Sequence, residues 1–106
     1  MTESYEPADA ARRLNAGELA LVDVRDRDEW EQGHVEGALH IPAEDLQTRG
    51  GELPGDRPVA FTCRTGKRSQ MAAEESARSG RDADNVSGGM KAWEQAGLPV
   101  QRGDAA

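Results

Sequence analysis

Residues 58–80, PVAFTCRTGKRSQMAAEESARSG, place an apolar run, a cationic loop and an alanine-rich segment in direct succession. The run from Pro58 to Thr62 is typical of a buried strand, and residues 68–79 are rich in strong helix formers up to a stop at Gly80. The sequence therefore predicts a strand that leads through a tight loop into a helix, with Cys63 at the end of the strand.

The segments that precede this unit alternate in the same way. Patterning and capping signals predict, in chain order, a helix over residues 8–15 with Pro7 in its first turn, a strand over 19–25, a short helix over 27–32 capped by Asp26, a strand over 38–41 and one or two helical turns over 44–48. The Gly- and Pro-rich stretch 50–58 is expected to be a surface loop.

The segments that follow complete the pattern. Residues 85–86 predict a last short strand, and a helix over 90–96 follows a Gly-Gly turn. Such alternation is typical of an α/β fold with a mainly parallel sheet. At 106 residues the chain is long enough for one domain, expected over residues 5–100, and residues 101–106 are expected to form a disordered tail.

The composition excludes several classes of protein. The chain has 20 acidic against 13 basic residues and a net charge of −7, so nucleic acid and membrane surfaces are not expected partners. It contains no apolar stretch of roughly 18 residues and no signal peptide, which predicts a cytoplasmic protein. The single cysteine excludes an internal disulfide, no zinc-ligand spacing is present, and no metal or cofactor is expected.

The chemistry concentrates in the loop Cys63-Arg64-Thr65-Gly66-Lys67-Arg68-Ser69. Amide groups of a tight loop, the N-terminus of the following helix and three cationic side chains all favour a thiolate over a thiol. Gly66 allows a positive φ in the middle of the loop. We therefore expect Cys63 to be a nucleophile at neutral pH and the same groups to hold an anion beside it.

A lone cysteine is more often a small buried core residue than a nucleophile. The cationic, glycine-containing loop at a strand-to-helix junction outweighs that interpretation, because open α/β sheets place their ligand sites at such junctions. The Gly66-Lys67 pair does not complete a phosphate-binding P-loop, since that motif requires a glycine where this chain has Phe61.

Three blocks of the chain resemble the single-domain rhodaneses, which are sulfurtransferases. Residues 21–42, LVDVRDRDEWEQGHVEGALHIP, are similar to the family's Asp-x-Arg, acidic-turn and Gly-His-Ile-x-Gly-Ala segment. Residues 63–69, CRTGKRS, resemble its Cys-Arg-x-Gly-x-Arg-Ser loop, and residues 85–100, NVSGGMKAWEQAGLPV, resemble its closing Gly-Gly-x-x-x-Trp segment. The resemblance implies a rhodanese-like α/β fold, with a mainly parallel five-stranded sheet flanked by helices on both faces.

The resemblance also implies a mechanism. Cys63 attacks the outer sulfur of a small anionic donor, becomes a persulfide, and passes that sulfur to a thiol, cyanide or a protein acceptor. The donor is expected to be thiosulfate, with persulfide donors as an alternative, because cationic loops in the family accompany thiosulfate. The residues that cradle the persulfide and bind the donor are then Arg64, Thr65, Gly66, Lys67, Arg68 and Ser69.

Other positions receive structural interpretations. Asp23 and Arg25 are expected to support the site as an ion pair that braces the active loop. For His34 and His40 we favour structural hydrogen bonds over catalysis, because the persulfide route needs no imidazole base. Trp30 and Trp93 are expected in the core.

Two alternatives remain. Related phosphatases and arsenate reductases share this fold, but their loop is Cys-x5-Arg, whereas Cys63 to Arg68 is Cys-x4-Arg. The second alternative is a partner-binding module, either non-catalytic or a relay that receives sulfur from one protein and delivers it to another.

Overall fold

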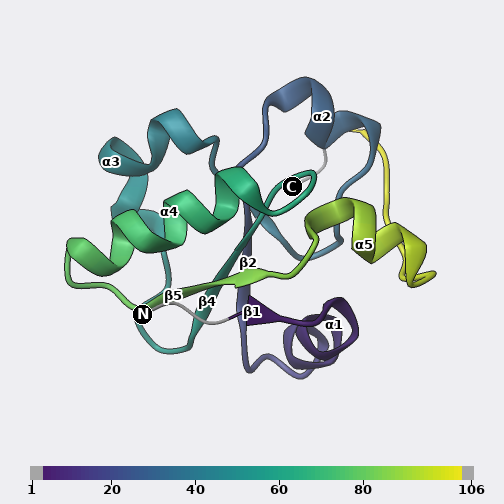
Figure 1. Ribbon diagram of the computed structural model, residues 1–106, viewed down its shortest axis with the longest axis horizontal. Coiled ribbons are helices and arrows are strands. Elements are labelled where there is room, and N and C mark those ends of the chain that lie inside the picture. Colours follow the sequence, from purple (N-terminus) through teal and green to yellow (C-terminus); the bar gives the residue numbers. More distant parts are fainter. Residues whose placement is uncertain (1–3, 104–106) are drawn as a thin grey trace.

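Five parallel strands form one sheet in the order β1-β5-β4-β2-β3, in a computed structural model that describes residues 4–103 (Figure 1). The strands are β1 (Ser4–Tyr5), β2 (Ala20–Asp23), β3 (Leu39–His40), β4 (Val59–Thr62) and β5 (Ala83–Val86). The helices are α1 (Pro7–Asn15), α2 (Arg27–Gln32), α3 (Leu46–Arg49), α4 (Lys67–Arg78) and α5 (Gly89–Gln95), with 3₁₀ turns at Ala43–Asp45 and Gly50–Glu52. The expected α/β fold with helices on both faces is confirmed.

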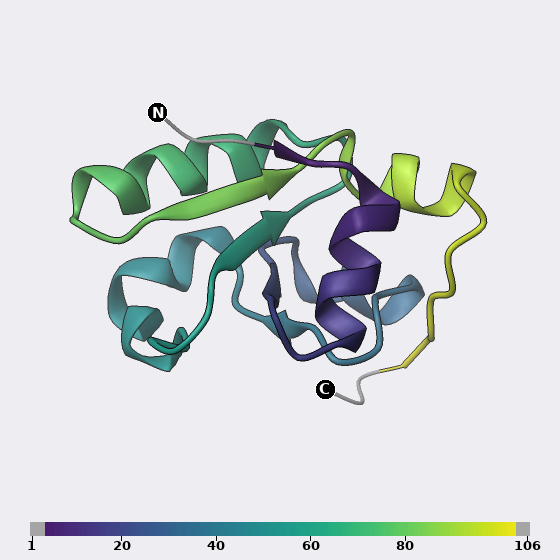
Figure 2. The same cartoon turned by 90° about the horizontal axis from the view of Figure 1, so that it is seen from below.

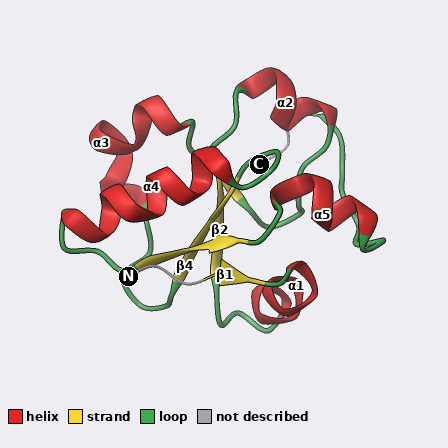
Figure 3. Ribbon diagram, in the orientation of Figure 1, coloured by secondary structure: helices red, strands yellow, loops and turns green. Residues whose placement is uncertain are grey.

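Helices cover both faces of the sheet (Figures 2 and 3), and each face has its own hydrophobic core. Side chains alternate along β4, so Phe61 packs with the α3 and α4 side while Ala60 packs with the α1, α2 and α5 side. Trp30 and Trp93 are both buried in the second of these cores, as expected. A four-residue strand buried on both faces explains why β4 has no polar side chain before Thr62.

The order of the strands positions the site. From β2 the chain crosses to β3 at one edge, then returns through α3 to β4 and continues to β5 on the other side. The direction of winding therefore reverses between β2 and β4. Ligands of open α/β sheets bind at the carboxyl ends of the strands at such a reversal. Cys63 follows β4 at this point, and Arg25 follows β2.

The structure extends the predicted fold in two places. Ser4 and Tyr5 form the edge strand β1, which pairs with β5 and which the sequence did not indicate. The last inner strand was predicted only for residues 85–86, but it begins at Ala83, because residues 83–85 pair with β4.

Two predicted loops are also more ordered than the sequence indicated. The predicted surface loop 50–58 begins with a 3₁₀ turn and buries Leu53. Within the predicted tail, Gln101 pairs with His34, and the amide of Gly103 donates to the Glu31 carbonyl, so residues 101–103 are attached to the domain. Residues 104–106 of that predicted tail lie outside the described residues. Across residues 4–103, no helix combines the length and apolar character needed to cross a bilayer.

Candidate active site

The sulfur of Cys63 accepts hydrogen bonds from the loop that surrounds it. The Gly66 amide lies 3.2 Å from Sγ, the Ser69 amide 3.4 Å and the Ser69 hydroxyl 3.3 Å. Gly66 caps α4 with φ of 101°, the positive φ predicted for it, and this conformation turns the amides inward. Cys63 is only 1% exposed, so a donor must be small or slender to reach the sulfur.

The pKa of the Cys63 thiol lies below its ordinary value. Burial by itself raises that pKa, but hydrogen bonds from the Ser69 hydroxyl and from the Ser69, Gly66 and Thr65 amides outweigh burial. These neutral donors, rather than the cationic side chains, are the groups that lower it most. The direction of this shift is the one expected, but its principal cause is different.

The first turn of α5 holds the backbone of the cysteine loop in place. The Met90 amide donates to the Cys63 carbonyl at 2.7 Å, and the Lys91 amide donates to the Arg64 carbonyl at 2.9 Å. Gly89 makes this approach possible, because a Cβ built there would lie 2.3 Å from the Cys63 oxygen. The N-terminal turn of α5 thus fixes the backbone of the loop. The sequence marked the Gly-Gly turn but gave no sign of this contact.

Asn85 is a further contributor that the sequence analysis missed. It lies on β5, next to Phe61 of β4, and is buried. Its side-chain carbonyl is a second acceptor within short hydrogen-bond distance of the Ser69 hydroxyl, and its amide donates to the Gly66 carbonyl at 3.4 Å. Asn85 therefore contacts both Gly66 and Ser69, two of the residues that surround the sulfur.

The three cationic side chains of the loop differ in their surroundings. Arg64 is exposed and lies 3.4 Å from Glu94. Arg68 makes two hydrogen bonds to Glu29, of 3.0 and 3.1 Å. Lys67 is exposed, and among residues 4–103 no carboxylate lies within ion-pair distance of it. Two of the three predicted anion-binding charges are thus partly neutralised by the protein itself.

Asp23 and Arg25 form the buried ion pair that the sequence predicted. Arg25 Nε lies 2.9 Å from Asp23 Oδ1 and Nη2 lies 2.8 Å from Oδ2, with side chains 4% and 1% exposed. The guanidinium also donates to the Gly33 carbonyl at the end of α2, at 2.6 Å. These bonds attach α2 to the end of β2. Among the described residues, the hydrogen bonds of the pair reach Gly33 and none reaches the cysteine loop, so its supporting role at the site stays a prediction.

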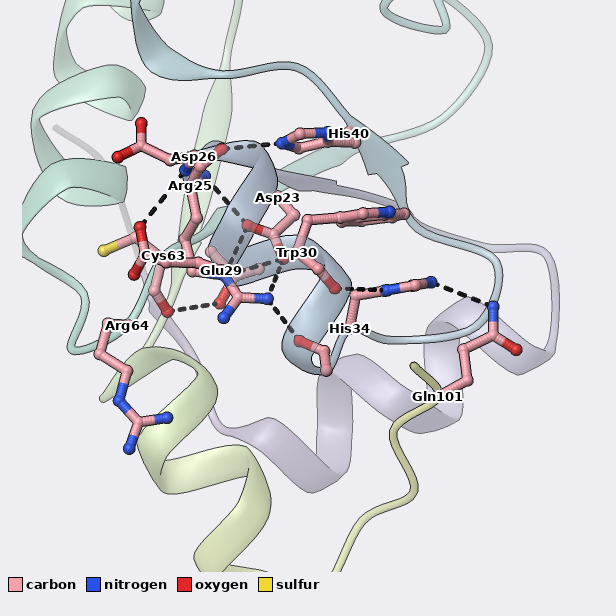
Figure 4. Close-up of polar contacts among 12 residues, drawn as sticks. Asp23, Arg25, Asp26, Glu29, Trp30, His34, His40, Cys63, Arg64 and Gln101 are labelled. Carbon is pink, nitrogen blue, oxygen red and sulfur yellow. Dashed lines mark hydrogen bonds and ion pairs between the residues drawn. The ribbon is translucent and has the colours of Figure 1, made fainter. Parts of the chain in front are cut away.

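Both histidines have structural partners, as expected. Their rings lie on either side of the Trp30 ring, with centroids 3.7 Å away for His34 and 4.7 Å away for His40 (Figure 4). His34 Nδ1 hydrogen-bonds to the Trp30 carbonyl at 2.7 Å, and His40 Nε2 to the Arg25 carbonyl at 2.8 Å. This stack rigidifies the segment around α2. Over the described part of the chain, no cluster of three or more His, Cys, Asp or Glu could hold a metal ion.

Comparisons with known proteins agree with this geometry. The family model for the rhodanese-like domain matches residues 6–96. The chain is 44% identical to an HTH-type transcriptional regulator of Mycobacterium tuberculosis over 91% of this chain and 43% of the regulator. It is 36% identical to a Bacillus subtilis protein named as a sulfur carrier, over 71% of this chain and 41% of that protein. The chain thus spans less than half the length of these curated relatives.

A solved structure also resembles this chain over most of its length. The rhodanese-related protein from Thermoplasma volcanium superimposes with a TM-score of 0.85 at 28% identity, covering 93% of this chain and 97% of the other. The chain therefore belongs to the rhodanese-like domain family.

Proposed function

We propose that the domain is a sulfurtransferase that moves a sulfane sulfur through a persulfide on Cys63. The observation that carries this proposal is the convergence of three hydrogen-bond donors, from Gly66 and Ser69, on a buried sulfur whose pKa is lowered. A thiolate at neutral pH is the nucleophile that the reaction requires. The name of the B. subtilis relative, a sulfur carrier, agrees with this chemistry.

The reaction proceeds in two steps. The Cys63 thiolate attacks the outer sulfur of thiosulfate or of a persulfide, and the donor's S–S bond breaks with its electron pair on sulfite or on a thiolate. The Cys63 persulfide then rests among the amides of residues 64–69. An acceptor thiolate, or cyanide, attacks the outer sulfur and returns Cys63 to the thiolate.

Mass spectrometry tests the first step. The purified protein is treated with thiosulfate or with a small persulfide, and Cys63 is expected to gain the mass of one sulfur atom. Cys63→Ser is the matched control, because its hydroxyl is nearly isosteric but is not ionised at neutral pH. A persulfide-free Cys63 with both donors, together with Cys63-dependent hydrolysis of an aryl phosphate, contradicts the proposal and supports the phosphatase alternative.

A second candidate is a sulfur-relay module within a larger protein. It is favoured by the two curated relatives, each of which extends to more than twice the matched length and one of which is a transcriptional regulator. In that role Cys63 delivers sulfur to a protein acceptor rather than to a small thiol. Multiple turnover with cyanide supports the enzyme, whereas a single stable loading of Cys63 without turnover supports the relay. For either role we propose a cytoplasmic setting, where the lone thiol stays reduced.

A further inference from the structure

Glu29 holds the guanidinium of Arg68 in a two-pronged ion pair. Nη1 lies 3.0 Å from Oε1 and Nη2 lies 3.1 Å from Oε2, and the two side chains are 41% and 32% exposed for Arg68 and Glu29 respectively. The contact joins α2 to the first turn of α4, from positions 39 apart in the sequence. Parallel N–H···O bonds of this kind fix the orientation of the guanidinium as well as its charge.

Further contacts fix the position and the charge of the Glu29 carboxylate that binds Arg68. Its Oε1 accepts a hydrogen bond from the Asp26 amide at 3.3 Å, as the third residue of a capping box at the start of α2. The hydrogen bond from Arg68 lowers the pKa of the Glu29 carboxyl, so the carboxylate is charged at neutral pH. Asp26 adds a second acidic neighbour to Arg68 (Figure 4 shows Asp26 and Glu29 with Cys63 and Arg64).

The other two cations of the loop, Arg64 and Lys67, differ from Arg68 in their surroundings. Arg64 makes a single contact of 3.4 Å with Glu94, whereas Arg68 makes two hydrogen bonds to Glu29. Lys67 is exposed. Arg68 directly precedes Ser69, whose amide and hydroxyl lie 3.4 and 3.3 Å from the Cys63 sulfur, and the negative sulfur contributes to raising the pKa of Arg68. An anionic donor at the sulfur must therefore compete with Glu29 for this guanidinium.

The two donor classes differ in how much they need that guanidinium. Thiosulfate enters with two negative charges: its S–S bond breaks, a Cys63–sulfur bond forms, and sulfite leaves with two charges. A persulfide R–S–S⁻ enters with one charge and leaves as R–S⁻, after the same exchange of one S–S bond for another. Since like charges repel at the thiolate, the dianion depends more strongly on a free cation.

We propose that Glu29 determines donor specificity in this domain, by holding Arg68 as an internal counter-ion and so disfavouring thiosulfate relative to a singly charged persulfide. The inference rests on the proposed sulfurtransferase function. If Glu29 had only a structural role, capping α2 and bracing α4, its loss would lower the rates with both donors equally. The ratio of the two rates is the informative quantity.

The test compares Glu29→Gln with the wild type. Glutamine keeps an oxygen for the Asp26 amide but loses the charge that holds Arg68. With thiosulfate and the persulfide of 2-mercaptoethanol as donors, the ratio of kcat/KM for thiosulfate to that for the persulfide is expected to rise about five-fold or more. Adding Arg68→Ala to Glu29→Gln should cancel this gain. In the wild-type background, Arg68→Ala should reduce thiosulfate use less than it does in the Glu29→Gln background.

Glu52→Gln is the matched control. It removes the same charge from a similar pair with Arg49, whose two hydrogen bonds measure 2.8 and 3.0 Å, and it should leave the ratio unchanged. An unchanged ratio in Glu29→Gln, or equal effects of Arg68→Ala in both backgrounds, contradicts the inference while the function stands. Failure of the wild type to form a Cys63 persulfide with either donor contradicts the function instead. Should Glu29→Gln fold poorly, Glu29→Asp keeps the charge but is too short for both bonds, and it should shift the ratio in the same direction.

Discussion

The Ser69 hydroxyl lies within hydrogen-bond distance of two acceptors, the side-chain carbonyl of Asn85 and the sulfur of Cys63, which is 3.3 Å away. A hydroxyl carries one proton, so it cannot donate to both acceptors at once. When Cys63 is a thiolate, the negative sulfur attracts that proton. When Cys63 carries a second sulfur, the charge moves to the outer atom and the hydroxyl can return to Asn85. The Ser69 hydroxyl can thus donate to the sulfur in the thiolate state and to Asn85 in the persulfide state, the two states that the proposed sulfur transfer requires.

Ser69→Ala should raise the pKa of Cys63. The Ser69 hydroxyl heads the hydrogen bonds that lower this pKa, and alanine removes it while keeping the Ser69 amide. A thiolate is lost as pH falls through the thiol pKa, so raising that pKa moves the acidic limb of the reactivity profile to higher pH. On that limb we expect alkylation by iodoacetamide to slow by roughly ten-fold, since a hydrogen bond to a charged group is worth about 1.5–3 kcal/mol.

Asn85→Ala supplies the opposite test. Removing the competing carbonyl frees the Ser69 hydroxyl for the sulfur, so the acidic limb should move to lower pH. Circular dichroism and thermal unfolding establish that both variants are folded. Shifts of the same sign in Ser69→Ala and Asn85→Ala would show that Asn85 serves only to pack the loop.

Gly89→Ala should slow the reaction of Cys63 with an alkylating reagent, beyond what the backbone strain of the substitution alone would cause. Gly89 has φ of 61°, and a Cβ there would lie 2.3 Å from the Cys63 carbonyl oxygen, so the loop must move. Gly97→Ala is the control: φ is 75° there, but nothing lies within 4 Å of its Cβ. Both variants carry similar strain, on the order of 1 kcal/mol. Only Gly89→Ala is expected to slow the alkylation of Cys63, and equal rates in the two variants would contradict this role for α5.

The order of elements was predictable because each apolar run in this chain is short and well bounded. Strands β2 and β4 are four-residue runs with every residue buried, and Gly17, Gly33 and Gly80 end the segments around them. Strand β1 could not be predicted in the same way. It has two residues, one of them exposed, and it exists because β5 offers an unpaired edge to it.

The site was predictable only where it is local in sequence. The loop from Cys63 to Ser69 carries its own signal, since a cysteine, a glycine and three cations occur within seven residues. Glu29, Asn85 and Gly89 act on that loop from other elements. Their contacts arise from strand order and helix packing, which no short-range pattern encodes. For the same reason, the sequence could not show that Arg68 already has a carboxylate partner.

Arg25→Met should destabilise the domain strongly. Methionine keeps much of the apolar volume but leaves the buried Asp23 carboxylate without its guanidinium and frees the Gly33 carbonyl. Breaking a buried ion pair in this way costs about 3–5 kcal/mol of unfolding free energy. Urea unfolding measures the loss. Asp56→Ala, which breaks the exposed pair with Arg57, should leave the midpoint nearly unchanged. Similar midpoints for the two variants would contradict the bracing role of the buried pair.

Inserting one glycine after Gly66 should separate sulfur chemistry from phosphate chemistry. In the wild type, the Gly66 and Ser69 amides both lie within 3.4 Å of the Cys63 sulfur. The insertion lengthens the loop between Cys63 and Arg68 and should move these two amides apart. We expect the variant to lose persulfide formation and to gain room for a tetrahedral oxyanion. Persulfide formation is followed by mass spectrometry and oxyanion binding by calorimetry with arsenate.

The control insertion places a glycine after Gly55, where a Cβ would meet nothing within 4 Å and the added residue stays away from Cys63. This variant should form the persulfide as the wild type does. Full persulfide formation by the Gly66 insertion would mean that loop length does not tune the site to a single sulfur, because the amides would then have converged on Cys63 from a longer loop. The choice between sulfur and phosphate would in that case depend on the charges around Arg68 rather than on the spacing of the amide donors.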